Sequence, residues 1–161
     1  MMIMKISFEK LDKIQQNIVN EAEKVIKNAY DPYSQFYVGA AVLTKKGNIY
    51  KGININTCAY NSLCAERVAI SQAVSHGEYV FKKIAVIAKS DFFEVKNLSG
   101  PCGICRQMIW EFAELVKKDI EIIVVDSEKK KALVTTIKKI HPYGFGPRLC
   151  GGKYEKYLKT T

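Results

Sequence analysis

The sequence predicts a single α/β domain in which a mixed central sheet lies between two layers of helices. Three observations support this prediction. The chain has 161 residues, of which 48% are hydrophobic, and this suits one domain with a buried core. Segments with helical periodicity alternate with short apolar segments that are typical of strands. Their order, a helix, two hairpin strands, then helix, strand, helix, strand and strand, is typical of a three-layer α/β/α arrangement.

The first half of the chain is expected to form a helix, a hairpin and a second helix. The first helix ends before "YDPYS", and its apolar residues recur every three or four positions at Leu11, Ile14, Ile18, Ala22, Val25 and Ala29. Residues 36–44, "FYVGAAVLT", predict a buried strand, which a turn at 45–48 joins to an alternating strand at 49–57. Residues 64–74, "CAERVAISQAV", predict a second helix that Gly77 closes.

The second half continues with two buried strands around a third helix. Residues 83–89 and 120–126 are almost entirely apolar, as central strands are. Between them, residues 101–116 predict a helix whose inner face carries Ile104, Met108, Phe112 and Leu115. Residues 131–140 predict a strand that runs into a short helix. The whole chain, 1–161, is treated as one domain, with 149–161 as a polar, mobile tail after a Gly/Pro-rich loop.

The net charge and the N-terminal sequence indicate which partners and which cellular location to expect. The formal net charge is +9, but the basic residues occur in scattered pairs such as "TKKG" and "FKKI". This scatter favours a lysine-rich solvated surface over a nucleic-acid partner. The sequence has neither an apolar run of membrane-spanning length nor the features of a signal peptide. We therefore expect a cytoplasmic protein with no membrane partner.

Five cysteines are present, at 58, 64, 102, 105 and 150, which is an odd number without a secretion signal. This argues against a disulfide framework and for metal binding or catalysis. Cys102 and Cys105 alone would also suit a redox pair. A closed zinc knot with Cys58 or Cys150 as fourth ligand is another alternative. Otherwise we expect Cys58 to be a small buried apolar residue and Cys150 to be an incidental thiol of the tail.

The cysteines at 64, 102 and 105 lie at the starts of two predicted helices, where the free N–H groups favour thiolates. Three thiolates predict one Zn²⁺ per chain with an open fourth position, as in catalytic sites, where zinc lowers the pKa of a bound water. Glu66, two residues after Cys64, is placed to transfer that water's proton. Arg67 is expected to offset the negative charge of the sulfurs from beside the site.

These motifs resemble those of a known family. Cys64-Ala65-Glu66 and Pro101-Cys102-Gly103-Ile104-Cys105 follow the zinc deaminase signature. Residues 30–147 resemble the small cytidine deaminases that act on free nucleosides. The resemblance implies a cytidine-deaminase-like domain and a homotetramer with shared active sites. It also implies hydrolytic deamination of cytidine or deoxycytidine, with release of ammonia, as part of pyrimidine salvage.

The resemblance further implies the roles of single residues. Phe36 would pack near the base, and Asn54 would bind ribose hydroxyls. The backbone of Ala65 and the side chain of Glu66 would read the carbonyl and the ring nitrogen of cytosine. Phe145 would stack on the base in a neighbouring subunit. From the residues alone, both phenylalanines would suit ordinary packing, and Asn54 and Asn56 would suit either a pocket wall or an exposed strand face.

The sequence departs from the family pattern on the wall that holds the sugar. Asn56 stands where family members usually have a glutamate, and the stretch from Tyr60 to Cys64 is one residue shorter than usual. An amide gives a hydroxyl a weaker hydrogen bond than a carboxylate does. The alternative substrate is therefore a modified cytosine nucleoside such as a blasticidin-type antibiotic. Editing of RNA or DNA and a non-catalytic zinc module are two further alternatives.

Overall fold

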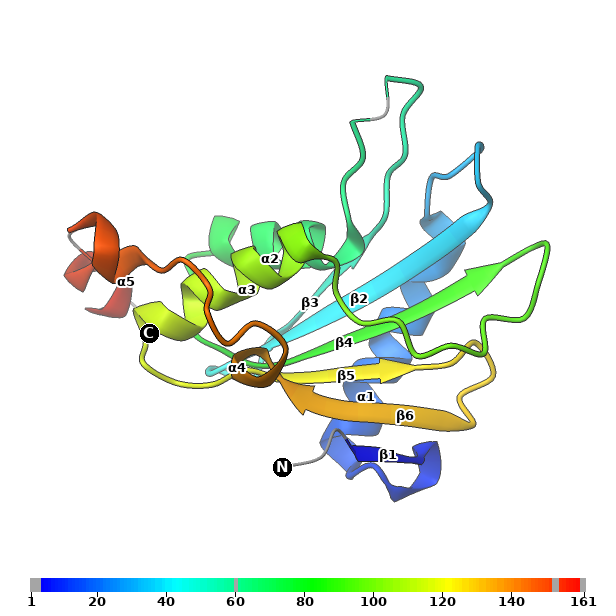
Figure 1. The fold of residues 1–161 in the computed structure, drawn as a ribbon, viewed down its shortest axis with the longest axis horizontal. Coiled ribbons are helices and arrows are strands. Elements are labelled where there is room, and N and C mark those ends of the chain that lie inside the picture. Colours follow the sequence, from blue (N-terminus) through cyan, green and yellow to red (C-terminus); the bar gives the residue numbers. More distant parts are fainter. Residues whose placement is uncertain (1–3, 60, 152–153, 160–161) are drawn as a thin grey trace.

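The computed structural model describes residues 4–59, 61–151 and 154–159. Its centre is a six-stranded sheet in the order β1-β6-β5-β4-β2-β3 (Figure 1). The strands are β1 (Met4–Ser7), β2 (Phe36–Thr44), β3 (Ile49–Ile53), β4 (Phe81–Ser90), β5 (Glu121–Val125) and β6 (Lys131–Thr136). β4 and β5 pair in parallel and the other neighbours pair antiparallel, so the predicted mixed sheet is confirmed.

Helices cover both faces of this sheet. The α-helices are α1 (Lys13–Val25), α2 (Ala65–Ser75), α3 (Gly103–Leu115), α4 (Ile137–Ile140) and α5 (Glu155–Lys159). Short 3-10 helices are η1 (Phe8–Lys10), η2 (Ile26–Asn28) and η3 (Pro147–Cys150). α1 lies behind the sheet, and α2 and α3 lie in front of it (Figure 1). The three-layer α/β/α arrangement predicted from the sequence is therefore confirmed.

β4 shows how the pattern of the sequence builds two cores. Ile84 and Val86 belong to the core under α2 and α3. Ala85 and Ile87, which alternate with them, belong to the core under α1. Because successive strand residues point to opposite faces, a strand buried on both sides must be apolar at every position.

Two glycines let the helices approach the sheet closely. A Cβ atom at Gly52 in β3 would lie 2.2 Å from the Ala65 carbonyl oxygen and 2.4 Å from the Ala69 nitrogen in α2. On the opposite face, a Cβ atom at Gly39 in β2 would lie 2.1 Å from the Ala22 carbonyl oxygen in α1. The missing side chain of Gly52 therefore fixes how deeply the start of α2 sits on the sheet.

Some boundaries differ from the sequence predictions. α1 begins after Asp12, whose side chain and backbone form a reciprocal capping box with Gln15. Ile14 lies in its first turn but is 55% exposed, so placing it on the inner face was wrong. The edge strand β1, paired with β6, was not predicted. The second hairpin strand ends at Ile53 and not at residue 57.

The inner face of α3 was predicted correctly only in part. Ile104 is 64% exposed, while Met108 and Phe112 are only partly buried against the core. The buried residues of α3 are Cys105, Ile109, Trp110 and Ala113. The helix is therefore rotated by about one residue relative to the prediction, and this turns Cys105 inwards.

The tail was expected to be polar and mobile, but its described part is folded. The end of η3 and all of α5 lie within it, and Tyr157 of α5 packs edge-on against Tyr79 at 5.1 Å. The side-chain hydroxyl of Tyr154 donates a hydrogen bond to the Pro147 carbonyl. The tail is therefore anchored to the domain at these points.

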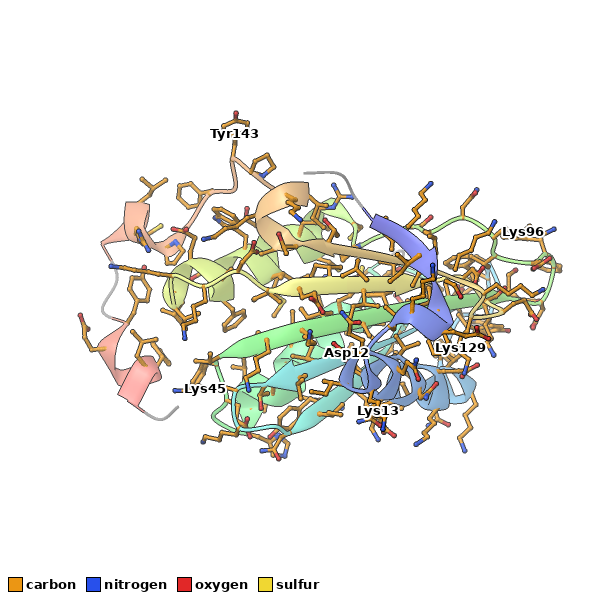
Figure 2. The ribbon with its side chains drawn as sticks, turned by 90° about the horizontal axis from the view of Figure 1, so that it is seen from below. Asp12, Lys13, Lys45, Lys96, Lys129 and Tyr143 are labelled. Carbon is orange, nitrogen blue, oxygen red and sulfur yellow. The ribbon has the colours of Figure 1, made fainter. Side chains whose placement is uncertain are left out.

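The basic residues are spread over the surface. Lys45 and Lys96 lie towards opposite ends of the molecule (Figure 2). Lys89 and Lys129 both pair with Glu23, at 2.9 and 2.6 Å. Among the described helices, we find none with the length and hydrophobicity of a membrane span.

Candidate metal centre and active site

Three cysteines meet at the N-termini of two helices. Cys64 is the N-cap residue of α2, Cys102 is the N-cap residue of α3, and Cys105 lies in the first turn of α3. The Sγ atoms of Cys64 and Cys102 are 3.7 Å apart, and those of Cys102 and Cys105 are 3.6 Å apart. A tetrahedral zinc ion with Zn–S bonds of about 2.3 Å requires sulfurs about 3.8 Å apart. The three thiols therefore fit a zinc ion, and the predicted ligand set is brought together in one cluster.

The three-cysteine cluster favours the thiolate form of Cys64. The hydrogen bond from Cys105 is the main cause that lowers the pKa of Cys64 to about 6. Cys102 and the charge of Arg67 lower it further, whereas burial opposes the shift. The pKa of Cys105 is raised, because it donates to Cys64 and because it is buried. A cation bound here would replace the shared protons, since zinc takes its cysteine ligands as thiolates.

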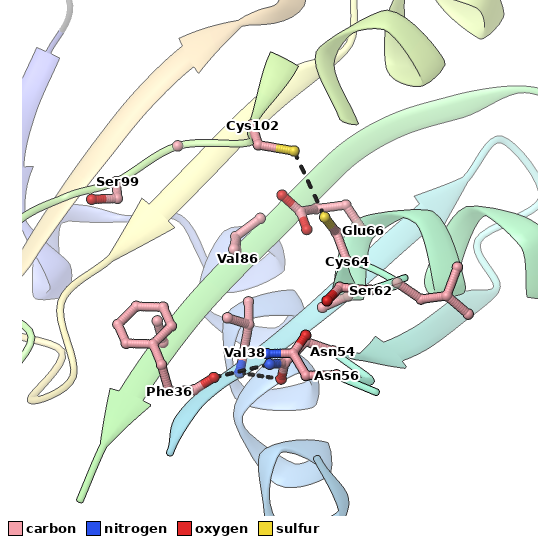
Figure 3. Close-up of a pocket in the computed structure, with 14 residues that line it drawn as sticks. Phe36, Val38, Asn54, Asn56, Ser62, Cys64, Glu66, Val86, Ser99 and Cys102 are labelled. Carbon is pink, nitrogen blue, oxygen red and sulfur yellow. Dashed lines mark hydrogen bonds between the residues drawn. The ribbon is translucent and has the colours of Figure 1, made fainter. Parts of the chain in front are cut away.

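Glu66 is buried beside the sulfurs. It occupies the second position of α2 and is only 5% exposed. Burial is the main cause that raises the pKa of its carboxyl group, and the negative charge of Cys64 adds to the effect. The carboxyl group points towards the sulfurs of Cys64 and Cys102 (Figure 3). A carboxyl group in this position can exchange a proton with a ligand at the metal's open position.

The cluster forms one end of a pocket of about 260 Å³, a size suited to a small ligand. Phe36, Val38, Val86 and Ala88 supply an apolar wall. The carboxamides of Asn54 and Asn56 lie at the end away from the sulfurs (Figure 3). Ser62 and Ser99 complete the lining together with Leu63, Ala65 and Gly100. The pocket therefore has a metal-binding end, an apolar middle and a polar amide end.

The two asparagines differ in how they are held. Asn54 is 6% exposed, and its Oδ1 accepts a hydrogen bond from the Val38 backbone nitrogen at 2.8 Å. Its Nδ2 donates to the Phe36 carbonyl oxygen at 2.9 Å. Asn54 therefore fastens the end of β3 to β2. Asn56 lies beyond the strand, lines the same pocket and makes no such bond to β2 among the described contacts.

The other predicted site residues occupy several places. Ala65 and Phe36 line the pocket. Arg67 lies outside it, in a neighbouring groove, and acts on Cys64 through its charge. Phe145 is 60% exposed and does not line the described pocket of its own chain. Cys58 is exposed, so the expectation of a small buried residue was wrong; Cys150 is also exposed, as an incidental thiol of the tail would be.

Asp31 is a residue near the site that we did not predict from the sequence. It is 2% exposed and follows Tyr30, whose carbonyl oxygen accepts a hydrogen bond from the Asn56 backbone nitrogen. Its signal was the order Asp-Pro-Tyr-Ser in "YDPYS". An aspartate three residues before a serine is typical of a side-chain-capped turn. Tyr60, at the start of the shortened stretch, lies outside the described residues.

A mixed sheet between two helix layers, with three thiols beside a buried glutamate, defines a zinc-binding deaminase. Residues 12–120 match the model of the cytidine and deoxycytidylate deaminase zinc-binding region. The chain belongs to this family, as the resemblance predicted.

Relatives and solved structures agree with this assignment. The chain is 45% identical to the cytidine deaminase of Sporosarcina psychrophila over 98 residues, which are 60% of this chain and 68% of that protein. It is 40% identical to the cytidine deaminase of Halalkalibacterium halodurans over 108 residues, 66% and 76% of the two chains. The structure matches that of cytidine deaminase from Burkholderia pseudomallei with a TM-score of 0.70 and 31% identity, over 81% of this chain and 98% of that chain.

Proposed function

We propose that this protein catalyses the hydrolytic deamination of cytidine and deoxycytidine to uridine and deoxyuridine, with release of ammonia. The observation that carries this proposal is the buried Glu66 carboxyl group directed at a three-cysteine cluster at one end of a small pocket. A structural zinc site would need no buried acid beside it, because a buried carboxyl group without a function only costs free energy.

The residues of the chain divide the chemistry between them. A zinc ion held by Cys64, Cys102 and Cys105 would supply a Lewis acid that lowers the pKa of a water molecule towards neutrality. Glu66 would take the proton of the attacking water and deliver it to the ring nitrogen of cytosine. The water oxygen would bond to C4 of the base, and Glu66 would move the second proton of that water to the amino group, so that the C4–N bond breaks and ammonia leaves. One water is consumed, and Glu66 ends in its starting state.

The start of α2 would also read the base. The backbone N–H of Ala65 is in the first turn of the helix, where amide groups have no partner within the helix. It can donate a hydrogen bond to the 2-carbonyl of cytosine. Phe36 would pack against the base from the apolar wall. The amide end would then face the sugar, with Asn54 and Asn56 as the polar groups in reach of its hydroxyls.

A modified cytosine nucleoside, such as a blasticidin-type antibiotic, is the second candidate substrate. Asn56, a neutral residue on the wall that would face the sugar, favours it. The shortened segment before Cys64 changes the same wall. The base chemistry is the same for both candidates, so they differ only in what occupies the amide end of the pocket.

A substrate panel tests the proposal. Ammonia release is measured with zinc-loaded protein and cytidine, deoxycytidine, CMP, dCMP, a blasticidin-type nucleoside and a cytosine-containing oligonucleotide. We expect the highest kcat/KM on the two free nucleosides. A preference for the blasticidin-type compound would select the second candidate, and turnover of the oligonucleotide would indicate editing. If none of these compounds releases ammonia, the remaining alternative is a non-catalytic zinc module.

We also propose that the protein is a cytoplasmic homotetramer that serves pyrimidine salvage and whose subunits share their active sites. The exposure of Phe145 supports sharing, since this ring is free to reach a neighbouring subunit. Ile104 and Leu63, 64% and 40% exposed beside the metal site, offer apolar surface for such a contact. Light scattering coupled to size exclusion measures the assembly, and a monomer with full activity would contradict it.

A further inference from the structure

Phe36 stands on the apolar wall of the pocket, at the first position of β2 (Figure 3). Its backbone is held from two sides. The Phe36 nitrogen donates to the Asp31 carboxylate at 3.3 Å, and the Gln35 carbonyl oxygen accepts from the Asp91 nitrogen at 3.4 Å. Within the sheet, Phe36 pairs with Ser90, the last residue of β4. The backbone of this wall is therefore fixed, and the orientation of the Phe36 ring depends on what packs beside it.

The ring of Phe93 packs against the ring of Phe36. The two centroids are 6.3 Å apart and the ring planes differ by 28°, which is a stacked arrangement. Both values suit the offset geometry that aromatic pairs prefer. The hydroxyl of Tyr37, the next residue of β2, donates to the Asp91 carboxylate at 2.9 Å. This bond ties the segment after β4 to the start of β2, so that Phe93 comes to lie beside Phe36.

The segment that carries Phe93 also reaches the metal centre. Residues 91–102 connect the end of β4 to the start of α3. In the middle of this segment, Val95 is buried, and its carbonyl oxygen accepts a hydrogen bond from the Ser127 nitrogen at 3.1 Å. The last part of the segment lines the pocket and ends at Cys102, one of the three thiols of the metal centre. One anchored segment therefore connects the aromatic contact to the metal centre.

The core of the domain does not depend on the ring of Phe93. This ring is 58% exposed, whereas Val95 and the partly buried Leu98 anchor the same segment to the domain. Beside Phe36, however, a second ring restricts the first. Stacked rings keep their contact only while their planes stay close to parallel, so Phe93 favours one orientation of the Phe36 ring. Phe93 therefore affects the shape of the pocket wall more than the stability of the fold.

We propose that Phe93 is a positioning residue, which stacks on Phe36 and holds that ring in the orientation that contacts the base of the bound nucleoside. This proposal rests on the proposed function and adds a residue to its base-binding wall. Phe93 does not line the pocket itself, so it acts through Phe36. The base makes this apolar contact equally in the ground state and in the transition state, so the contact lowers KM and leaves kcat unchanged.

The test measures KM and kcat on cytidine, and the inhibition constant of uridine, with zinc-loaded variants. We expect Phe93→Ala to raise KM and the uridine constant by the same factor, about two- to tenfold, which is the contribution of an aromatic pair. kcat should stay close to the wild-type value. Phe93→Tyr keeps the flat ring and should behave as wild type. The matched control is Phe92→Ala, because this neighbouring ring is 69% exposed and has no ring partner among the described contacts. Its loss should change neither constant.

A double variant tests whether Phe93 acts through Phe36. If it does, removing Phe93 from a protein that already lacks the Phe36 ring should cost nothing more. Phe36→Leu and Phe36→Leu/Phe93→Ala should therefore have the same KM for cytidine. If the two losses multiply instead, Phe93 acts independently of Phe36, and the positioning role is overturned.

The outcomes separate this inference from the proposed function. A wild-type KM in Phe93→Ala, or a fall in kcat alone, would overturn the role of Phe93 while wild-type turnover upholds the deaminase. If the wild-type protein turns over no cytosine nucleoside, the proposed function fails and takes this inference with it. Should Phe93→Ala not fold, Phe93→Leu, which keeps an apolar side chain without the flat ring, is compared with Phe93→Tyr. Equal KM values for those two variants would refute the stacking role.

Discussion

Gly52→Ala should damage the fold and the active site together. The added Cβ would lie 2.2 Å from the Ala65 carbonyl oxygen, whereas real contacts of this kind begin near 3.0 Å. α2 must therefore move by about 1 Å, and overpacking of this size typically costs about 1–3 kcal/mol. With a urea m-value of about 2 kcal/mol/M, the unfolding midpoint should fall by about 0.5–1.5 M.

The same displacement would change the active site, because α2 carries Glu66 and has Cys64 as its N-cap residue. A misplacement of about 1 Å can cost about 100-fold in rate. The assay is urea unfolding followed by fluorescence, with kcat measured on the fraction that remains folded. Gly39→Ala is the matched control, since its Cβ would collide with α1, which carries no site residue. It should lose comparable stability and keep most of its kcat. If Gly52→Ala kept both the wild-type midpoint and kcat, the reasoning on helix placement would be refuted.

Three further predictions concern single features. Cys105→Ser should lower zinc affinity by more than about 100-fold, because losing an indirect partner of a metal already costs about 10–100-fold; a chelator competition measures this, and full zinc retention would contradict it. The pKa of Asp31 is lower in the folded state, so its stabilising contribution is present above the unfolded value near 3.8 and is lost as the pH falls through the folded value. Asp31→Asn should therefore flatten the loss of stability between pH 5 and about pH 2, measured as ΔG of unfolding, and an unchanged slope would count against it. Mixing inactive Phe145→Ala and Glu66→Gln proteins should restore activity if subunits share sites, and no restoration would argue for independent sites.

The strands and the metal centre were the parts of the structure most open to prediction. The middle of β4, residues 84–88, and all but the first residue of β5 are apolar because both faces of these strands are covered, and this pattern is local in the sequence. The three cysteines were recognisable because the spacing of Cys102 and Cys105 puts both thiols on the first turn of one helix. The third thiol, Cys64, precedes another predicted helix. The three cysteines meet if the N-termini of the two helices lie side by side.

The rotation of α3 and the position of Asp31 could not be predicted from the local sequence pattern. α3 has two apolar stripes, and periodicity does not say which one faces the sheet. The stripe with Cys105 faces inwards because that thiol must meet Cys64, and Ile104 is left outside. Asp31 lies near Asn56 through a pairing of segments 25 residues apart, Tyr30 with Ile55, which only the folded chain brings together.

The most direct test of the account compares wild-type protein with Glu66→Gln in one preparation, scoring zinc content and ammonia release from cytidine together. An amide keeps the size of the buried side chain but cannot carry a proton. We predict one zinc per chain in both proteins, and a fall in kcat of at least about 100-fold in the variant, since general acid–base catalysis is worth about 10²–10⁴-fold. A variant within tenfold of the wild-type rate, or an active wild-type protein without zinc, would contradict the claim that Glu66 transfers protons at a three-cysteine zinc site.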